Sequence, residues 1–250
     1  MKKNISAFTR IELVVVLTVI FAVLVAVLLP FWIRAKMTAL SMCCNCNLKQ
    51  ISMAYRVWAN DNGGQYPAKS TNGWREIAMS GKAASYCWTN YALMHSELGE
   101  STIILTCPAD NRSPAPSYAT LANTNISYFC NVNANETSLT SFLGGDRNLS
   151  PGPEPADDYG FSPADGRGAD VTLTTNDTKI CWSLKMHKRH SAAYGNILFG
   201  DGIAQIPGTE TLRKDWQGYF TCSIATRGTN TDGTTRFITY STDTMRLIFP

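Results

Sequence analysis

Two short patterns in this sequence place potential metal ligands at regular spacing. Cys43 and Cys46 form a C-x-x-C, and His187 and His190 form an H-x-x-H. Two thiolates and two imidazoles are a donor set that can hold Zn²⁺ tetrahedrally. However, no second C-x-x-C accompanies the first, and an apolar run rather than a strand precedes it, unlike in a thioredoxin-like redox motif. We therefore expect neither a zinc site nor a redox site here, and no cofactor.

A second candidate site is the stretch 149–170, which is rich in proline and glycine and carries several acidic residues. Its aspartates are Asp157, Asp158, Asp165 and Asp170. Calcium takes six to eight oxygen ligands, and loops of this kind supply them, but the EF-hand spacing is absent. A solvated irregular loop is the favoured interpretation, and a calcium site through these four aspartates is the alternative.

Catalytic and nucleic-acid-binding patterns are absent from the sequence. It contains no G-x-S-x-G, no H-E-x-x-H and no phosphate-binding G-x-x-x-x-G-K-[ST]. The net charge is only +3, without the basic stripe that nucleic acid usually requires. We therefore expect a protein that is not an enzyme and binds no nucleic acid. An anchored hydrolase of unrecognised type is the least favoured alternative.

The elements that position these residues begin with a long apolar segment. From Leu13 to Ile33 no residue is charged, and Arg34 ends the run. At 1.5 Å per residue, a helix of this length spans roughly 30 Å, the thickness of a bilayer core. Its length, and Pro30 near its end, argue against a cleaved secretory signal. We predict a single membrane span, with the N-terminus in the cytoplasm and the rest exported.

The helix is predicted to continue to about Asn60 with a different pattern. An apolar stripe is formed by Leu40, Cys44, Leu48, Ile51, Tyr55 and Trp58. This spacing predicts an amphipathic helix that packs one face on a domain, with Ser41, Asn45, Lys49, Gln50 and Arg56 facing elsewhere. Eight cysteines in an exported chain suggest disulfides. A bridge between Cys44 and Cys107 would clamp the helix to the domain; ordinary buried cysteines are an equal alternative.

The segment 7–13, Ala-Phe-Thr-Arg-Ile-Glu-Leu, resembles the prepilin cleavage and methylation motif of type IV pilins and type II secretion pseudopilins. The resemblance implies cleavage between Ala7 and Phe8, with Ala7 where the family usually has Gly, and N-methylation of Phe8. It also implies that Glu12, fifth in the mature chain, meets the new α-amine of a neighbouring subunit. Such a partner would offset the cost of a carboxylate at membrane depth. The alternative is a plain anchor with Glu12 at the headgroup interface.

The remainder of the chain is predicted to form an exported domain of the α+β class. Short β-prone runs alternate with turns, so we expect an antiparallel sheet that covers the apolar stripe of the helix, as in a pilin-like fold. The expected division is a leader at 1–7, a membrane-spanning half-helix at 8–33, an amphipathic half-helix at 34–62 and a globular domain at 63–250. The expected strands are Ala84–Trp88, Thr102–Thr106, Ile126–Val132, Val171–Thr174, Lys179–Ser183, Gly195–Phe199, Tyr219–Ala225, Arg236–Tyr240 and Met245–Phe249, with short helices at Trp74–Met79 and Ala92–Leu98.

Further short segments resemble a large subgroup of bacterial prepilin-like proteins. They are 47–51, 58–67, 107–110, 145–148, 186–202 and 246–250. One of them resembles a processing-associated motif of His, nine residues and Asp-Gly, in which Asp201 and Gly202 match the end. The histidine is either His190, with ten intervening residues, or His187, with thirteen. We favour a structural role, in which Asp201-Gly202 forms a hairpin turn. A metal or partner role for His190 and Asp201 is the alternative.

Taken together, the resemblance implies a structural subunit of a type IV pilus or a type II secretion pseudopilus-like filament. Its expected partners are the membrane, other copies or related subunits through the N-terminal helix, the prepilin peptidase and methylase, and a secretion or pilus assembly platform. The expected location is the bacterial inner membrane or a filament extending from it. The alternative is a monomeric, signal-anchored binding domain.

Overall fold

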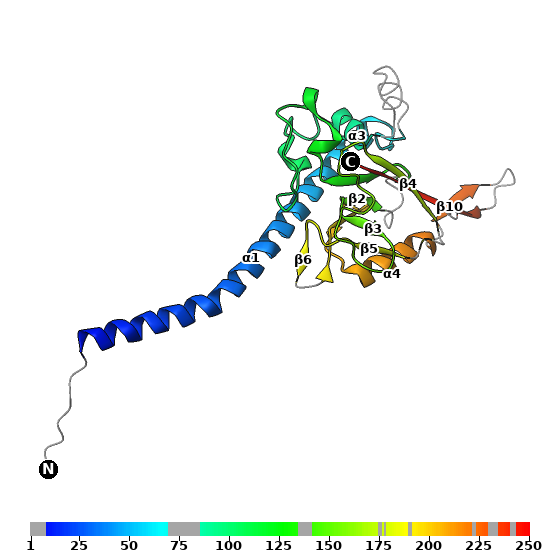
Figure 1. Ribbon diagram of the computed structural model, residues 1–250. Helices are drawn as coiled ribbons and strands as arrows, with labels where there is room; N and C mark the ends of the chain where they lie inside the picture. The colour runs from blue at the N-terminus through cyan, green and yellow to red at the C-terminus, as the bar shows by residue number, and fades with distance from the viewer. Residues whose placement is uncertain are drawn as a thin grey trace, which may run out of the picture. The chain divides into compact units, whose positions relative to one another are not determined.

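The computed structural model describes residues 9–69, 86–134, 142–174, 177, 179–189, 192–221, 224–229, 235–240 and 244–250 (Figure 1). The chain divides into two compact units, Met1–Ala39 and Leu40–Pro250. The first unit holds the N-terminal part of a long helix. The second holds the rest of that helix together with the globular domain.

The long helix, α1, spans Arg10–Asp61 and continues through Pro30. These bounds confirm the prediction of one helix that ends near Asn60. The chain leaves the helix where the N–H of Gly64 donates to the carbonyl of Ala59 at 2.7 Å, and Gly63 and Gly64 both have a positive φ. Glycine adopts this conformation at little cost, which explains why the helix ends here.

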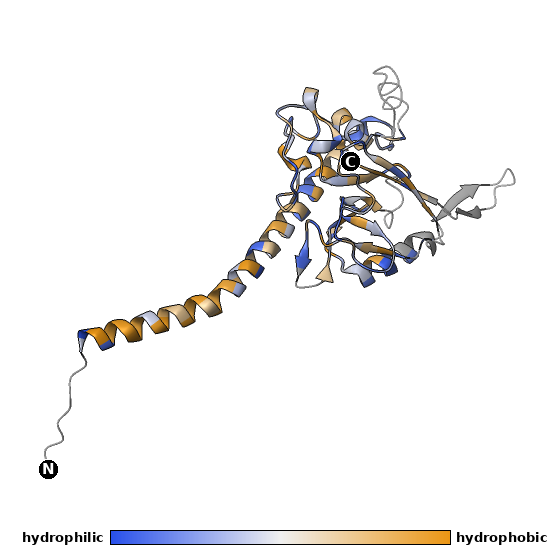
Figure 2. Cartoon of the chain, in the orientation of Figure 1, coloured by the Kyte–Doolittle hydropathy of each residue, from blue (hydrophilic) through white to orange (hydrophobic). Residues whose placement is uncertain are grey.

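The two halves of α1 differ in hydropathy, as Figure 2 shows. The first half is apolar on all sides, whereas apolar and polar residues alternate along the second. Cys44, Leu48, Ile51, Tyr55 and Trp58 are all buried in the second unit, which confirms the predicted stripe. The prediction that Ser41 and Asn45 face elsewhere is wrong, because both are buried. The buried face is therefore wider than its apolar residues alone indicate.

A six-stranded antiparallel sheet forms the centre of the second unit, in the order β4-β12-β1-β2-β8-β9. Its strands are β1 (Tyr128–Asn131), β2 (Phe142–Asp146), β4 (Ala169–Thr174), β8 (Ile197–Phe199), β9 (Ala204–Gln205) and β12 (Thr244–Phe249). The sheet packs against α1, so the predicted α+β class with antiparallel pairing is confirmed.

Smaller elements surround this sheet. Among the described residues, three two-stranded pairs are formed by β3 (Leu149–Pro151) with β5 (Ile180–Trp182), β6 (Lys188–Arg189) with β7 (Ala192–Ala193), and β10 (Ile224–Thr229) with β11 (Thr235–Tyr240). The helices are α3 (Cys87–Leu93) and α4 (Thr209–Thr221), and the 3₁₀ turns are η1 (Ile103–Leu105), η2 (Tyr118–Thr120) and η3 (Asn123–Asn125).

Both faces of the sheet are covered, and strand β1 shows how. Tyr128 and Cys130 belong to the core cluster that includes the stripe of α1. Phe129, between them, belongs to a second cluster with Trp182 of β5 and Leu212 of α4. Alternate residues of a strand point to opposite faces, so α1 and α3 cover one face while β5 and α4 cover the other. A strand buried on both sides accounts for the continuous burial of β1.

Several predicted elements are wrong. The segment predicted as strand Ala84–Trp88 enters helix α3 at Cys87, and Thr102–Thr106 contains 3₁₀ turn η1 instead of a strand. Helix α4 occupies the start of the predicted strand Tyr219–Ala225, and strands β2 and β3 were not predicted. The predicted helix Trp74–Met79 lies outside the described residues.

Candidate functional site

The start of α1 shows how Glu12 is placed. Its Oε2 accepts the backbone N–H of Thr9 at 2.8 Å and the Thr9 hydroxyl at 2.9 Å, and the N–H of Glu12 donates to Thr9 Oγ1 at 3.3 Å. Reciprocal bonds of this kind form a capping box, which sequence analysis missed although the T-x-x-E spacing signals it. Glu12 therefore has a local partner. Ala7 and Phe8, the residues of the predicted cleavage, lie outside the described residues.

The apolar half of α1 has the features of a membrane anchor or a signal sequence. Its large apolar side chains are exposed, from 37% at Val25 to 78% at Ile11. The one polar side chain of the run, Thr18, donates its hydroxyl to the carbonyl of Val14 at 2.7 Å. The hydroxyl thus needs no solvent partner, which suits an apolar surrounding. Helix α1 is long and apolar enough to cross a bilayer.

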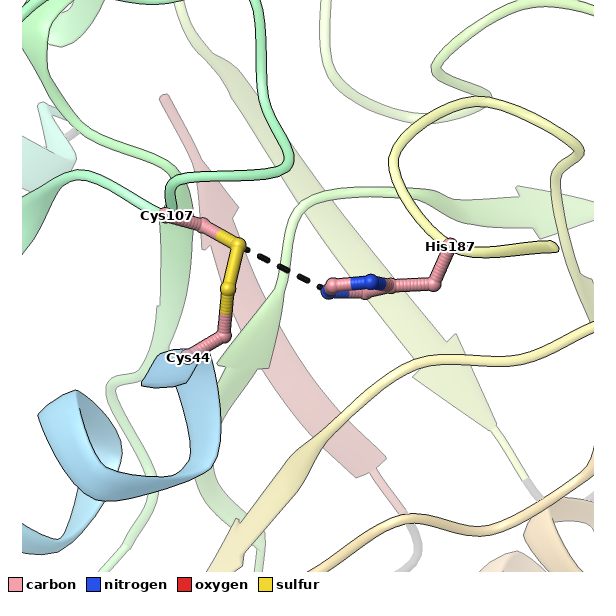
Figure 3. A group of neighbouring side chains, drawn as sticks. All are labelled: Cys44, Cys107 and His187. Atoms are coloured by element: carbon pink, nitrogen blue, oxygen red, sulfur yellow. Dashed lines mark hydrogen bonds between the residues drawn. A yellow bond between two sulfur atoms is a disulfide. The ribbon is translucent and has the colours of Figure 1, made fainter. Parts of the chain in front are cut away.

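Cys44 and Cys107 are joined by a disulfide, 63 residues apart in the sequence (Figure 3). Cys44 lies on the buried face of α1, and Cys107 lies just beyond η1. Both side chains are fully buried. The bridge connects the amphipathic half of α1 to a segment with little regular structure. The sequence left two alternatives open, a bridge between Cys44 and Cys107 or two ordinary buried thiols, and the structure contains the bridge.

A polar cluster surrounds this disulfide. His187 Nε2 lies 3.6 Å from Cys107 Sγ and 3.2 Å from Asp146 Oδ2. Asn196 donates its backbone and side-chain N–H groups to the same Asp146 oxygen, at 2.7 and 2.6 Å. Asn45 of α1 donates to Asn196 Oδ1 at 3.5 Å. Buried polar groups are costly unless they are paired, so these bonds fix how α1, β2 and the strand β8 region pack.

The same cluster contains three potential metal ligands. One donor atom each from Cys44, Cys107 and His187 lie within 4.8 Å of one another. A cysteine binds zinc through its thiolate sulfur. The disulfide takes up both sulfurs, so the bonded form offers the imidazole alone. Cys43 and Cys46, from the C-x-x-C, are exposed and do not belong to this group.

A cysteine, a histidine and an aspartate also suggest a catalytic triad, but the geometry differs from one. In a triad the aspartate holds Nδ1 of the histidine, so that Nε2 is free to take a proton from the nucleophile. Here Asp146 contacts Nε2, and Nδ1 of His187 has no hydrogen-bond partner. Cys107 is buried and disulfide-bonded. The cluster is therefore arranged to hold segments together and does not present a nucleophile to a substrate.

A second buried network is built from residues close in sequence to those of the first. Arg147 donates to both carboxylate oxygens of Asp110, at 2.7 and 2.9 Å, and to Asn111 Oδ1 at 3.0 Å. Ser127 donates to Asp110 Oδ2 at 2.7 Å, and the guanidinium lies 3.4 Å from the ring centre of Tyr159. Burial alone would raise the pKa of Asp110, but the bonds and charge of Arg147, together with the hydrogen bonds from Ser127 and Asn111, lower the pKa below its usual value.

The two networks bring together short segments that sequence analysis noted one by one. Segment 107–110 supplies Cys107 and Asp110, and segment 145–148 supplies Asp146, Arg147 and Asn148. The Asn148 amide donates to the carbonyls of three residues that flank His187 on both sides: Ser183, Lys185 and Tyr194. Sequence analysis missed the roles of Asp146, Asn196 and Asn45. The only signal in the sequence is that Asp146 and Asn196 lie in segments 145–148 and 186–202, which resemble segments of prepilin-like proteins.

The four candidate calcium ligands have other partners. Asp170 forms a bidentate ion pair with Arg246, and Asp165 lies 3.0 Å from Arg167. Asp157 lies 3.6 Å from Lys185, and Asp158 accepts the backbone N–H of Gly160 at 2.8 Å. The structure does not bring these aspartates into one group of donor atoms within the described ranges.

Asp201 and Gly202 form the turn between β8 and β9, as the structural interpretation predicts. Asp201 Oδ1 accepts the N–H of Ile203 at 2.8 Å, and Gly202 has a φ of +85°. The carbonyl of Asp201 also accepts a hydrogen bond from Arg56 of α1. The hairpin turn is thus a docking point for the helix. His190, the other candidate of this motif, lies outside the described residues.

A polar hollow of about 290 Å³ opens beside the Asp110–Arg147 pair. It is lined by Asn111, Arg112, Ser113, Thr124, Asn125, Arg147, Tyr159 and Ala164. The guanidinium of Arg112 is committed to backbone carbonyls, including that of Asn123 at 2.8 Å. Burial and the charge of Arg147 lower the pKa of Arg112 to about 10. The hollow has the size of a small-ligand site, but its two cations already have partners.

Comparison of the chain with protein-family models, curated proteins and solved structures finds no match in any of the three.

Proposed function

We propose that this chain is a prepilin-like structural subunit, which is cut between Ala7 and Phe8 and assembles through α1 into a type IV pilus or type II secretion pseudopilus-like filament. The observation that best supports the proposal is that the two halves of α1 differ in their exposure. Its first half exposes apolar side chains on all sides, and its second half is built into an antiparallel α+β domain. A helix that is apolar all round requires lipid or other helices as its surroundings.

The position of Glu12 supports the same proposal. A carboxylate at the start of a membrane-length run is costly there unless it is paired. The capping box with Thr9 satisfies Oε2. After cleavage before Phe8, Thr9 would remain in the chain, and the capping box would survive. The carboxylate would still carry a charge, which the new α-amine of a neighbouring copy would neutralise.

The buried clusters give the domain a role that fits a structural subunit. The disulfide Cys44–Cys107 and the Asp110–Arg147 pair hold irregular segments against α1 and the sheet. In a filament subunit, this clamp would keep the domain attached to the helix through which the copies assemble. In this proposal the chain is a substrate of the prepilin peptidase and methylase, and is not itself an enzyme.

The test is intact mass and N-terminal peptide analysis of the full chain isolated from native membranes. We expect a chain that begins at N-methylated Phe8. The matched variant Ala7→Gly, which restores the residue usual in the family, should be cut at least as completely. A chain that still begins at Met1 in both proteins would overturn the proposal.

The second candidate is a monomeric, signal-anchored binding domain. The polar hollow beside Arg112 and Arg147 favours it, because about 290 Å³ would accommodate a small polar ligand. This function needs neither cleavage nor self-association. A monomeric chain that retains its leader in native membranes would support it over the filament subunit.

A further inference from the structure

Cys87 and Cys130 lie side by side in the core. Cys87 begins helix α3 and Cys130 lies in strand β1, and their sulfurs are 3.5 Å apart. Their side chains are exposed by only 0% and 2%. Both are free thiols in the structure. A disulfide has a sulfur–sulfur distance of about 2.05 Å, so the two sulfurs would have to approach each other by roughly 1.5 Å to form the bond.

The surroundings of the two thiols are apolar. Cys87 and Cys130 belong to the same core cluster as Tyr55 and Tyr91, and Cys87 Sγ donates to the carbonyl of Tyr128 at 3.2 Å. Burial raises the pKa of the Cys87 thiol. Because the thiolate is the reactive form, this pair would react slowly once the domain is closed. Oxidation would therefore occur while the chain is still folding.

We propose that Cys87 and Cys130 form a second disulfide when the chain folds in an oxidising compartment. Two S–H bonds break and one S–S bond forms. The two protons and two electrons pass to an external disulfide, either oxidised glutathione or the active-site disulfide of a thiol oxidoreductase, which is reduced to two thiols. This exchange proceeds through a mixed disulfide on one of the two cysteines.

The bond would constrain a part of the domain that has little regular secondary structure. In the described segment between α3 and β1, the regular elements are the 3₁₀ turns η1, η2 and η3. Cys107 lies inside this segment and is already bonded to α1. With Cys87–Cys130 closed, the segment would be fixed at both ends and near its middle. Such cross-links stabilise mainly by restricting the unfolded chain.

The test is disulfide mapping of the purified full chain in detergent, refolded and equilibrated at a series of ratios of reduced to oxidised glutathione. The samples are quenched in acid, alkylated and digested. Trypsin alone is unsuitable, because no Lys or Arg lies between Lys82 and Arg112, so Cys87 and Cys107 remain on one peptide. Additional cleavage after Glu97 and Glu100 separates these two cysteines.

We expect a linked peptide pair containing Cys87 and Cys130, two hydrogen masses lighter than the reduced peptides. In a Cys87→Ser variant, Cys130 should become alkylated, whereas Cys43→Ser should leave the linked pair unchanged. If both thiols are alkylated at every glutathione ratio, or if either is linked to another cysteine, the proposal is overturned. The experiment requires neither leader cleavage nor filament formation, so its outcome is independent of the proposed function.

Discussion

At the scale of single residues, the Asp110–Arg147 ion pair has the largest predicted energetic consequence. Both side chains are buried, with 0% and 2% of their surface exposed. Removing one partner of such a pair leaves the other charge uncompensated in the interior. We expect Asp110→Asn to lower the free energy of unfolding of the full chain in detergent by about 3–5 kcal/mol at neutral pH. Urea titration followed by fluorescence measures this change.

The same pair predicts how stability depends on pH. The pKa of Asp110 is lower in the folded protein than its usual value of about 4. The stability it contributes is therefore fully present above pH ~4 and is lost as the pH falls through the lower folded value. The gap between wild type and Asp110→Asn should close in that acidic range.

The matched control for this prediction is Asp165→Asn. Asp165 is also ion-paired, at 3.0 Å from Arg167, but both side chains are exposed. An exposed pair contributes about 0–1 kcal/mol, so this variant should differ little from wild type. Equal losses in the two variants would show that burial of the Asp110–Arg147 pair has no energetic effect.

At the scale of the elements, the Cys44–Cys107 disulfide joins α1 to the segment after η1. Because it closes a loop with a sequence separation of 63, its loss should cost about 2–4 kcal/mol of unfolding free energy. We expect this loss in a Cys44→Ala/Cys107→Ala double variant, measured by denaturant unfolding. Cys43→Ala, which changes the exposed neighbouring residue, should have almost no effect. A double variant as stable as wild type would exclude a clamping role.

Elements with strong periodicity could be predicted from the sequence. Helix α1 has an uninterrupted apolar run followed by an amphipathic stripe, and β12 is a short, mostly apolar strand. Strand β2 could not be predicted, because Gly144 and Gly145 carry no side chain and are unfavourable in strands. The packing explains why position 145 is glycine. A Cβ on Gly145 would lie 2.7 Å from the Asn196 carbonyl oxygen and 2.9 Å from the Phe129 ring.

Only part of the cluster around the Cys44–Cys107 disulfide could be predicted from the sequence. Local spacing showed that Cys44 lies on the buried face of α1, because one helix sets that periodicity. It could not show that Asp146 and Asn196, 50 positions apart, share a hydrogen bond. That contact depends on the pairing of β2 with β8, and strand pairing between distant segments leaves no periodic signal in the sequence.

At the scale of the whole molecule, two substitutions of Glu12 distinguish its role in capping α1 from its proposed role in assembly. Glu12→Gln keeps the capping box, because glutamine also accepts from the backbone at this position, but it removes the negative charge. Glu12→Val removes both. If the carboxylate pairs with the α-amine of a neighbouring copy, both variants should lose self-association in native membranes. Chemical cross-linking followed by gel analysis measures it, and insertion is verified by carbonate extraction.

The comparison of the two variants decides between the roles. If the capping box is the only function of Glu12, Glu12→Gln should assemble as wild type does, and Glu12→Val alone should be impaired. If the chain is a monomeric anchor, wild type itself should show no cross-linked ladder. Loss of assembly in Glu12→Gln with normal insertion would therefore identify the charge, rather than the helix cap, as the feature that neighbouring copies recognise.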